Sequence, residues 1–368
     1  MSDTPGVALL MPVYNRAHLL EEVFESLAAT TTYPEVEVLA VDDGSTDGGI
    51  EIVQRWVASG RLPGLRHLEN SGKGAIDALN TALHAASGEY CVQIDSDVTV
   101  ETPHWIEHML ELMQIDDSVG IVTPKVVFDS GRLHTCGVNV IGPAGWHERP
   151  SHPAEQLGRR VWLNRHGERI PEGEGGEGER RVAEVDSGMG ACMMYRRDDA
   201  IAAGGYDTAY SPVWFDDVDL CIGIRRLGRK AFYLPDVRVI HHFFGRKPPE
   251  GRFARWHPRR LAQAVLRRTV GRLPLRAKGA VERRFPIDLE MNFTPAQCRL
   301  LRHHHAYWRE KWGWDARNPD MSEIERRWGD TEIWWSRDPE RRAAGEEIVR
   351  RYEARREQPR REQPLVRD

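Results

Sequence analysis

The segment 90–94 is short and apolar, and it leads directly into Asp95-Ser96-Asp97. A run of this length and composition, preceded by Gly88, is typical of a buried strand. A strand that ends in two carboxylates one residue apart places oxygen ligands at the carboxyl edge of a sheet, where ligands bind in open α/β sheets. Hard oxygen ligands favour Mg2+ or Mn2+, and substrate phosphates usually complete the coordination of such ions.

The first hundred residues alternate between strand-like and helix-like segments. Apolar runs at 7–11 and 36–41 predict two more strands, the first of them ended by Pro12, and apolar spacing over 19–27 predicts a helix between them. Such alternation is the signature of a parallel sheet with crossover helices. The carboxylates that follow 36–41 and 90–94 are therefore expected at one edge of that sheet.

Composition favours a soluble enzyme in a reducing compartment. The chain has 368 residues, of which 40% are hydrophobic and 29% charged, enough for one large domain and an appendage. A formal net charge of -5 gives no general attraction to nucleic acid. The five cysteines have no C-x-x-C spacing and are expected to be reduced thiols. No stretch approaches the ~18 apolar residues of a membrane span, so we expect a cytoplasmic protein whose membrane contact is at most peripheral.

Three regions differ from the rest in composition. The Gly- and Glu-rich segment 171–180 predicts a flexible loop, either over the acceptor side or at a hairpin tip. The segment 246–284 carries thirteen Lys and Arg against two Glu. Interleaved apolar residues make it either a basic helix for an anionic membrane or polyanion, or a solvated helix packed on the core. Tryptophans over 308–335 favour a buried helical anchor over sugar stacking. We expect a catalytic domain over 1–245 and a helical region over 246–368.

Seven motifs resemble those of family-2 glycosyltransferases of the GT-A fold and occur in the family's order. They are Pro12-Val13-Tyr14-Asn15-Arg16, Val41-Asp42-Asp43-Gly44-Ser45-Thr46-Asp47, Asn70-Ser71-Gly72-Lys73-Gly74, Ile94-Asp95-Ser96-Asp97, Gly204-Gly205-Tyr206-Asp207, Trp214-Phe215-Asp216-Asp217-Val218-Asp219-Leu220 and Val239-Ile240-His241-His242. The resemblance implies an α/β fold with a Rossmann-like, mostly parallel sheet flanked by helices. It also implies a metal-dependent, inverting, hexosyltransferase-like enzyme that uses a nucleoside-diphosphate sugar.

The same resemblance implies a donor site at the strand ends. Tyr14 would stack on the base, and Asp43 would accept the imide N–H of uracil or thymine, which favours UDP or dTDP, with GDP possible. Lys73 is either a phosphate contact or a surface lysine, and Asp42 and Asp43 are alternatively helix caps. The other donor-binding residues implied are Pro12, Asn15, Asn70, Asp95, Ser96, Gly188 and Asp216.

A divalent ion, Mn2+ or Mg2+, would act as a Lewis acid on the leaving diphosphate. In the family the second carboxylate of the D-x-D usually binds the metal, which implies Asp97, while Asp95 meets the ribose or a metal-bound water. A histidine completes the coordination in some members and matches His241, although the adjacent His242 leaves this choice open.

The resemblance places the catalytic base at Asp217, at the start of a predicted helix. The helix dipole keeps a carboxylate there ionised, so it can take a proton from an acceptor hydroxyl. Asp216 would shape the site, and Asp219 would be a cap or a supporting residue. The alternative is that all three aspartates are caps.

Two other functions fit parts of the sequence. A sugar nucleotidyltransferase would need a Gly-rich triphosphate loop near the first strand, and 12–16 is not one. A non-catalytic protein could bind a polyanion or an anionic membrane through 246–284, but the intact acidic motifs argue against a degenerate site. The sequence leaves the acceptor open.

Overall fold

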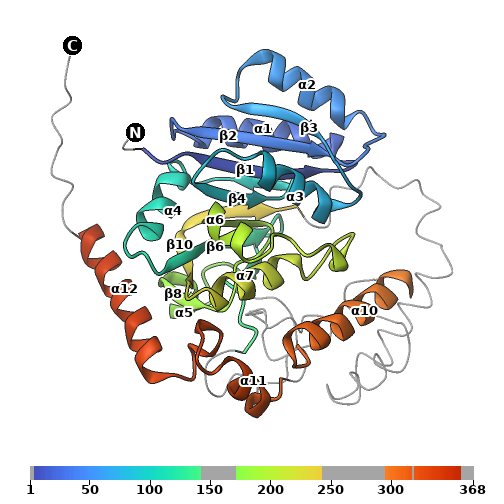
Figure 1. Ribbon diagram of the computed structural model, residues 1–368. Helices are drawn as coiled ribbons and strands as arrows, with labels where there is room; N and C mark the ends of the chain where they lie inside the picture. The colour runs from blue at the N-terminus through green and yellow to red at the C-terminus, as the bar shows by residue number, and fades with distance from the viewer. Residues whose placement is uncertain (1–3, 142–170, 243–294, 317–318, 358–368) are drawn as a thin grey trace.

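The computed structural model describes residues 4–141, 171–242, 295–316 and 319–357, and Figure 1 shows a central sheet with helices around it. The strands are β1 (Val7–Val13), β2 (Val36–Asp42), β3 (Leu65–Glu69), β4 (Tyr90–Ile94), β5 (Val98–Val100), β6 (Val119–Phe128), β7 (Leu133–Thr135), β8 (Ala183–Val185), β9 (Cys192–Arg196) and β10 (Lys230–His241). They form one sheet in the order β3-β2-β1-β4-β9-β6-β10-β5, with β7 beside β6 and β8 beside β10.

The sheet is parallel where the sequence alternates strand and helix. Strands β3, β2, β1 and β4 pair in parallel. The crossover helices are α1 (Ala17–Thr30), α2 (Gly49–Ser59) and α3 (Ala75–Ala85). Beyond β4 the sheet is mixed, because β9 enters antiparallel to both β4 and β6. The predicted α/β class, with a sheet flanked by helices, is confirmed.

Strand β1 continues one residue past the proline at which we expected it to end. Pro12 pairs with Val41 of β2, whereas the pairing of β1 with β4 stops at Leu10. Proline has no N–H to donate, and a strand position with a neighbour on only one side tolerates that loss. The expectation of a break at Pro12 was therefore wrong.

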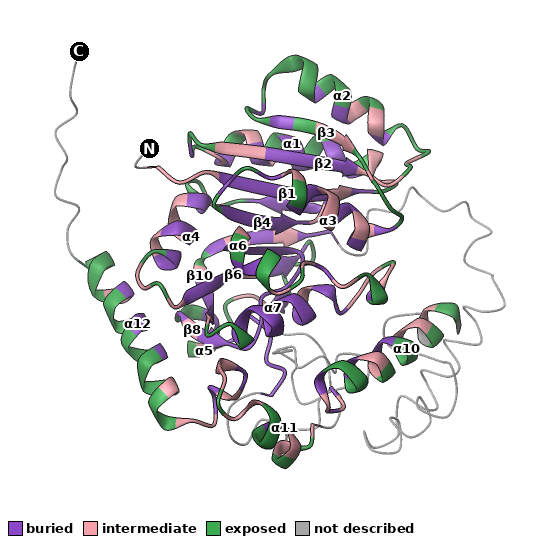
Figure 2. Ribbon diagram, in the orientation of Figure 1, coloured by how far each residue is buried: buried purple, intermediate pink, exposed green. Residues whose placement is uncertain are grey.

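Burial follows the apolar pattern of the sequence. Figure 2 shows the central strands mostly buried, while the outer helices α2 and α12 expose one side. The face of α1 predicted from its spacing is buried: Leu19, Leu20, Val23, Phe24 and Leu27. Helix α4 (Trp105–Met113) packs on the sheet through the fully buried side chains of Trp105, Ile106 and Met109. Helix α4 packs mainly against β6 and β10, the strand that ends at His241.

The described part of the C-terminal region is helical, as expected. It comprises α10 (Pro295–Trp312), α11 (Met321–Trp328), the short helix η6 (Glu332–Trp334) and α12 (Pro339–Glu357), which Figure 1 shows along one side of the sheet. Trp308, Trp312 and Trp314 are buried against one another, so the anchoring role predicted for these tryptophans is the one observed. The basic segment 246–284 lies outside the described residues.

The segment 171–180 is tied to the core, so the predicted flexible loop is wrong. The Glu179 carboxylate is buried and accepts hydrogen bonds from the N–H groups of Gly173 and Gly175, both at 2.8 Å. Glu172 pairs with Arg238 at 2.8 Å and with Lys125 at 3.0 Å. Glu172 and Glu179, two of the acidic residues that suggested a flexible loop, thus bind partners within the protein. Helix α5 (Glu177–Arg180) ends the segment.

Candidate functional site

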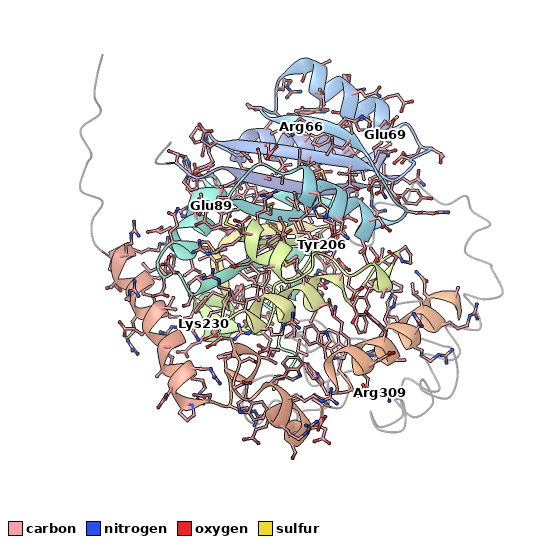
Figure 3. All side chains as sticks on the ribbon, viewed as in Figure 1. Arg66, Glu69, Glu89, Tyr206, Lys230 and Arg309 are labelled. Carbon is pink, nitrogen blue, oxygen red and sulfur yellow. The ribbon has the colours of Figure 1, made fainter. Side chains whose placement is uncertain are left out.

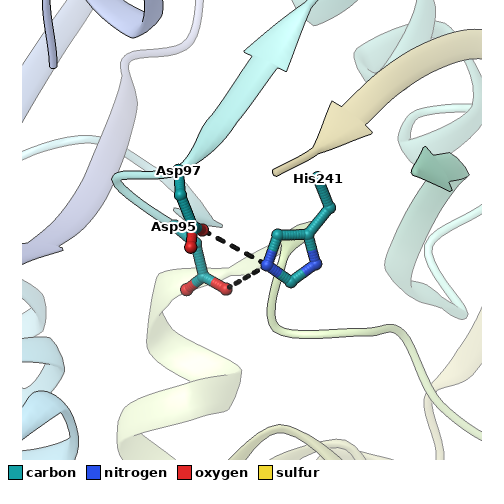
Figure 4. Close-up of side chains that lie close together, drawn as sticks. All are labelled: Asp95, Asp97 and His241. Carbon is teal, nitrogen blue, oxygen red and sulfur yellow. Dashed lines mark ion pairs between the residues drawn. The ribbon is translucent and has the colours of Figure 1, made fainter. Parts of the chain in front are cut away.

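Two chain segments, distant in sequence, bring Asp95, Asp97 and His241 together. The two aspartates lie in the turn between β4 and β5, and His241 ends β10. Strand β10 pairs antiparallel with β5 so that His241 lies opposite Val98, directly after the turn. One ligand atom from each of the three side chains lies within 4.8 Å of the others. Figure 4 shows both carboxylates facing the imidazole ring.

The cluster has the composition of a divalent-cation site. His241 Nε2 lies 3.2 Å from Asp97 Oδ1 and 3.8 Å from Asp95 Oδ2. Asp97 and His241 are buried, whereas 34% of the Asp95 side chain is exposed. Two carboxylate oxygens and one imidazole nitrogen suit Mn2+ better than Mg2+, which prefers oxygen alone. The exposed side of Asp95 is the side from which a further ligand could approach.

The two carboxylates differ in their electrostatic surroundings. Burial alone would raise the pKa of Asp97, but the hydrogen bond and charge of His241 and the charge of Arg16 lower it. The pKa of Asp95 is raised, first by loss of hydration and then by the charges of Asp97 and of the carboxylates at 216 and 217. An excess of negative charge therefore accumulates at this end of the sheet, which is the condition for binding a cation.

The two adjacent histidines point to different partners. His242 is buried, and its Nε2 lies 3.0 Å from Thr99 Oγ1. Its backbone N–H donates to the carbonyl of Asp97 at 2.9 Å. Successive side chains of a strand point to opposite faces, so only one of the two can face the aspartates. Of the described histidines, His241 is the one that joins the acidic pair.

Two neighbours of the cluster were not anticipated from the sequence. His134, on β7, is buried, and its Nδ1 lies 3.3 Å from Nδ1 of His241, with its ring stacked on Phe128 at 4.2 Å. No motif marks this histidine. Arg16 pairs with Asp97 Oδ2 at 3.1 Å. Its place in the first motif was a signal, although that motif assigned it no role.

A second acidic pair opens helix α7 (Asp216–Arg226). Asp217 accepts the N–H of Gly190 on Oδ2 and the N–H of Val218 on Oδ1, both at 2.8 Å. The next residue after Gly190, Ala191, accepts the N–H of Asp95 at 3.2 Å. The segment 190–191 therefore lies between the two acidic pairs. Burial and the charge of Asp217 raise the pKa of Asp216 to about 7.

The loops after β1, β2 and β3 are joined by hydrogen bonds. The backbone N–H of Asn15 donates to Ser45 Oγ at 3.1 Å, and Asn15 Oδ1 accepts the N–H of Thr46 at 2.9 Å. Asp43 Oδ1 accepts from Asn70 Nδ2 at 2.7 Å and from the N–H of Gly74 at 2.8 Å. The residues expected to bind the nucleotide therefore form one connected surface.

The other residues predicted at the donor site differ in exposure and in their hydrogen bonds. The Tyr14 ring is 56% exposed at the end of β1, and Lys73 is exposed. Asp42 accepts the N–H groups of Gly44 and Ser45 in the turn after β2. Helix α2 begins later, at Gly49, and has no side-chain cap, so the alternative of a helix-capping role for Asp42 is wrong.

Two small residues belong to the packed part of this region. Ser96 is buried in the turn between Asp95 and Asp97. A Cβ at Gly188 would meet Met193 Cβ at 2.9 Å, so a close approach to β9 requires this glycine.

Residues 8–167 match the family model described as glycosyl transferase family 2. O-antigen biosynthesis protein RfbC of Myxococcus xanthus is 30% identical over 246 residues, which cover 65% of this chain and 17% of RfbC. Putative glycosyltransferase EpsH of Bacillus subtilis is 36% identical over 108 residues, 29% of this chain and 30% of EpsH. The chain thus spans less than a third of either relative. The solved mannosyltransferase PcManGT of Pyrobaculum calidifontis is 19% identical with a TM-score of 0.46, over 96% of this chain and 87% of that one.

Proposed function

Because residues 8–167 match the model of glycosyl transferase family 2, we propose that this protein moves a sugar from a nucleoside-diphosphate sugar to an acceptor hydroxyl, with inversion and with a divalent cation. The observation that carries the proposal is the pair of acidic groups on either side of 190–191: Asp95 and Asp97 with His241, and Asp217 at the start of α7. In this arrangement a bound cation would stabilise the leaving diphosphate, and the carboxylate of Asp217 would accept the proton of the attacking hydroxyl.

We propose that Asp97 and His241 hold the cation and that Asp95 contacts it directly or through water. A bound Mn2+ or Mg2+ would neutralise the charge that develops on the leaving diphosphate. The contact of His134 with His241 Nδ1 orients the ring so that Nε2 faces the carboxylates. Arg16, partly exposed beside Asp97, is placed to meet a phosphate oxygen.

We propose Asp217 as the base that accepts the proton of the acceptor hydroxyl. Hydrogen bonds from the N–H groups of Gly190 and Val218 fix its carboxylate in one orientation. The positive end of the α7 dipole stabilises the ionised form of a carboxylate at that position. A base that is fixed and ionised can remove the proton as the new bond forms, and attack from the face opposite the diphosphate inverts the anomeric carbon.

The donor surface fits a pyrimidine nucleotide. Asn70 and Gly74 orient Asp43, which supports its proposed contact with the imide N–H of uracil or thymine, so UDP or dTDP is favoured and GDP is the next choice. Exposed Tyr14 is available to stack on the base. We assign Pro12, Asn15, Lys73, Ser96, Gly188 and Asp216 to the same donor site.

The charge of 246–284 supports a second proposal, peripheral contact with an anionic membrane at its cytoplasmic face. No helix in the described ranges is both long and apolar enough to cross a membrane. Co-sedimentation with anionic but not neutral vesicles, weakened by salt, is the expected result, and equal sedimentation with both would contradict it.

The test of the proposed donor and cation site is a thermal-shift panel of UDP-, dTDP- and GDP-sugars with Mn2+ or with chelator. We expect one nucleotide class to stabilise the protein only when Mn2+ is present. Asp97→Ala should lose this stabilisation, while Asp198→Ala, which removes a carboxylate that is 95% exposed, should keep it. Donor stabilisation of the Asp97→Ala variant in chelator, equal to that of the parent protein in Mn2+, would contradict the assigned cation site.

A further inference from the structure

The residues before α7 adopt a backbone conformation that side chains rarely allow. Trp214 has φ 77° and Phe215 has φ 74°, both in the left-handed region, and neither is glycine. Such conformations persist only where the surrounding structure fixes them, and they gather at functional sites. Asp216 and Asp217 follow immediately, so whatever fixes Trp214 and Phe215 also sets the start of the helix that carries the proposed base.

Helix α10 provides much of that support. Its His304 is fully buried, and Nε2 lies 3.1 Å from the carbonyl oxygen of Val213, next to the strained pair. The buried ring of Phe215 contacts three side chains of α10 edge-on, with centroids 4.9 to 6.0 Å apart: His304, His305 and Trp308. A helix nearly eighty residues later in the chain therefore holds the strained residues in place.

The same helix also holds the far side of α7. Asp219 accepts hydrogen bonds from Lys311 Nζ at 2.6 Å and from the indole Nε1 of Trp312 at 2.8 Å. Lys311 also donates to Asp207 at 2.6 Å. Asp217 and Asp219 are two residues apart, about 200° around the helix, so they lie on opposite sides. Gly190 thus holds one side of the first turn, and α10 holds the other.

We propose that α10 positions the base. Lys311 and Trp312 anchor Asp219, the first turn of α7 is thereby fixed, and Asp217 is held in the orientation in which it can accept the acceptor's proton. The inference rests on the proposed function, because it needs Asp217 to be the base. It assigns Lys311 as a positioning residue that acts through Asp217, and it makes the described C-terminal helices part of the catalytic unit.

The test compares Lys311→Met in the parent protein and in Asp217→Asn. The assay measures release of nucleoside diphosphate, with water as acceptor, from UDP-N-acetylglucosamine or the donor with the largest Mn2+-dependent thermal shift. We expect Lys311→Met to lower kcat roughly 10- to 100-fold, the usual effect of a misplaced catalytic group, with donor KM changed less than about twofold. Lys311→Arg, which keeps the charge, should restore most of the activity. In Asp217→Asn, Lys311→Met should change kcat by less than about threefold, because the base it positions is gone.

Two further variants guard against a purely structural effect. Trp312→Phe removes the indole donor to Asp219 while it keeps an aromatic ring at this buried position, and it should lower kcat in the same direction. It carries the test if Lys311→Met does not fold. Arg350→Gln, which removes an exposed pair with Glu347 on α12, should leave kcat unchanged.

The outcomes separate the two proposals. An equal loss of kcat from Lys311→Met in both backgrounds, or no loss in the parent, would overturn the positioning role alone. If Asp217→Asn keeps the parent kcat, the assigned base is wrong, and the positioning role falls with it.

Discussion

Asp216 and Asp217 are adjacent, yet their surroundings give them different properties. Asp217 is half-buried and accepts two backbone hydrogen bonds, whereas Asp216 is buried and its pKa is raised to about 7 by burial and by the charge of Asp217. Two N–H donors hold the Asp217 carboxylate in one orientation, which a base requires. Asp216, whose pKa is raised, is the carboxylate that holds a proton near neutral pH.

We predict that Asp217→Asn lowers kcat by roughly 10²–10⁴, the usual contribution of a positioned base, because the amide cannot accept the proton. Donor affinity should change little, since the carboxylate faces the acceptor. Steady-state kinetics and a donor titration with Mn2+ measure the two effects separately. Weakened donor binding with normal turnover would instead place Asp217 in the donor site.

A second residue-scale prediction concerns pH. The pKa of Asp216 rises from 3.8 to about 7 on folding, so the folded state holds its proton more tightly. Its contribution to stability is fully present below about pH 4 and is lost as pH rises through 7. Asp216→Asn should remove this loss, because an amide does not titrate; the slope removed is at most about 1.4 kcal/mol for each pH unit. Urea unfolding from pH 4 to 8 in chelator measures it, and parallel curves for the two proteins would contradict the assignment.

Local sequence patterns predicted part of the site, whereas pairing between distant strands decided the rest. Apolar runs and their spacing are local signals, so the sequence predicted Asp95 and Asp97 at a strand end and Asp217 at a helix start. The choice between His241 and His242 was not local, because it depends on the register of β10 against β5. His134 was missed for the same reason, since the pairing of β7 with β6 brings it beside β10.

The segment 171–180 shows how composition misleads. Its glycines and glutamates suggested a flexible loop, but Lys125 and Arg238, which pair with Glu172, are distant in sequence. Glu179 accepts hydrogen bonds from the backbone of its own segment and lies 3.6 Å from Lys125. A sequence window cannot report partners outside it, so order here follows from tertiary contacts.

We predict that Glu179→Ala destabilises the protein by about 2–4 kcal/mol, because the N–H groups of Gly173 and Gly175 and the Lys125 ammonium lose a buried charged partner. Glu177→Ala, on the exposed side of α5, should change the free energy of unfolding by less than about 0.5 kcal/mol. Urea unfolding measures both. If Glu179→Ala were as stable as Glu177→Ala, the segment would not be anchored through Glu179.

At the scale of the whole molecule, the C-terminal helices and the sheet domain share buried ion pairs. Arg225 of α7 donates to Glu184 at 2.8 Å and to the carbonyl of Glu332 at 3.0 Å. Lys230, labelled in Figure 3, pairs with the carboxylate of Glu332 at 2.8 Å. The Trp335 indole donates to buried Asp186. Breaking one partner of a buried pair is costly, so we expect the described parts to unfold together.

Gly345 of α12 tests this joint packing. A Cβ there would overlap Oε2 of Glu184, whose carboxylate is paired with Arg225 through Oε1. Replacing an exposed helix glycine with alanine usually raises the free energy of unfolding by roughly 0.5–1 kcal/mol. Gly345→Ala should instead lower it, because of this overlap. We predict a lower Tm with a single calorimetric transition. A gain in Tm, or a separate low-temperature transition, would show that α12 is not packed on Glu184 or does not unfold with the core.

We propose that this chain is a sugar-nucleotide transferase that depends on a cation held by Asp97 and His241. The most direct measurement is the rate of nucleoside diphosphate release from the best donor of the panel, in Mn2+ and in chelator, for the parent protein and for Asp97→Ala. We predict release by the parent only with Mn2+ and background release by Asp97→Ala in both. Equal release by both proteins in chelator would contradict the account.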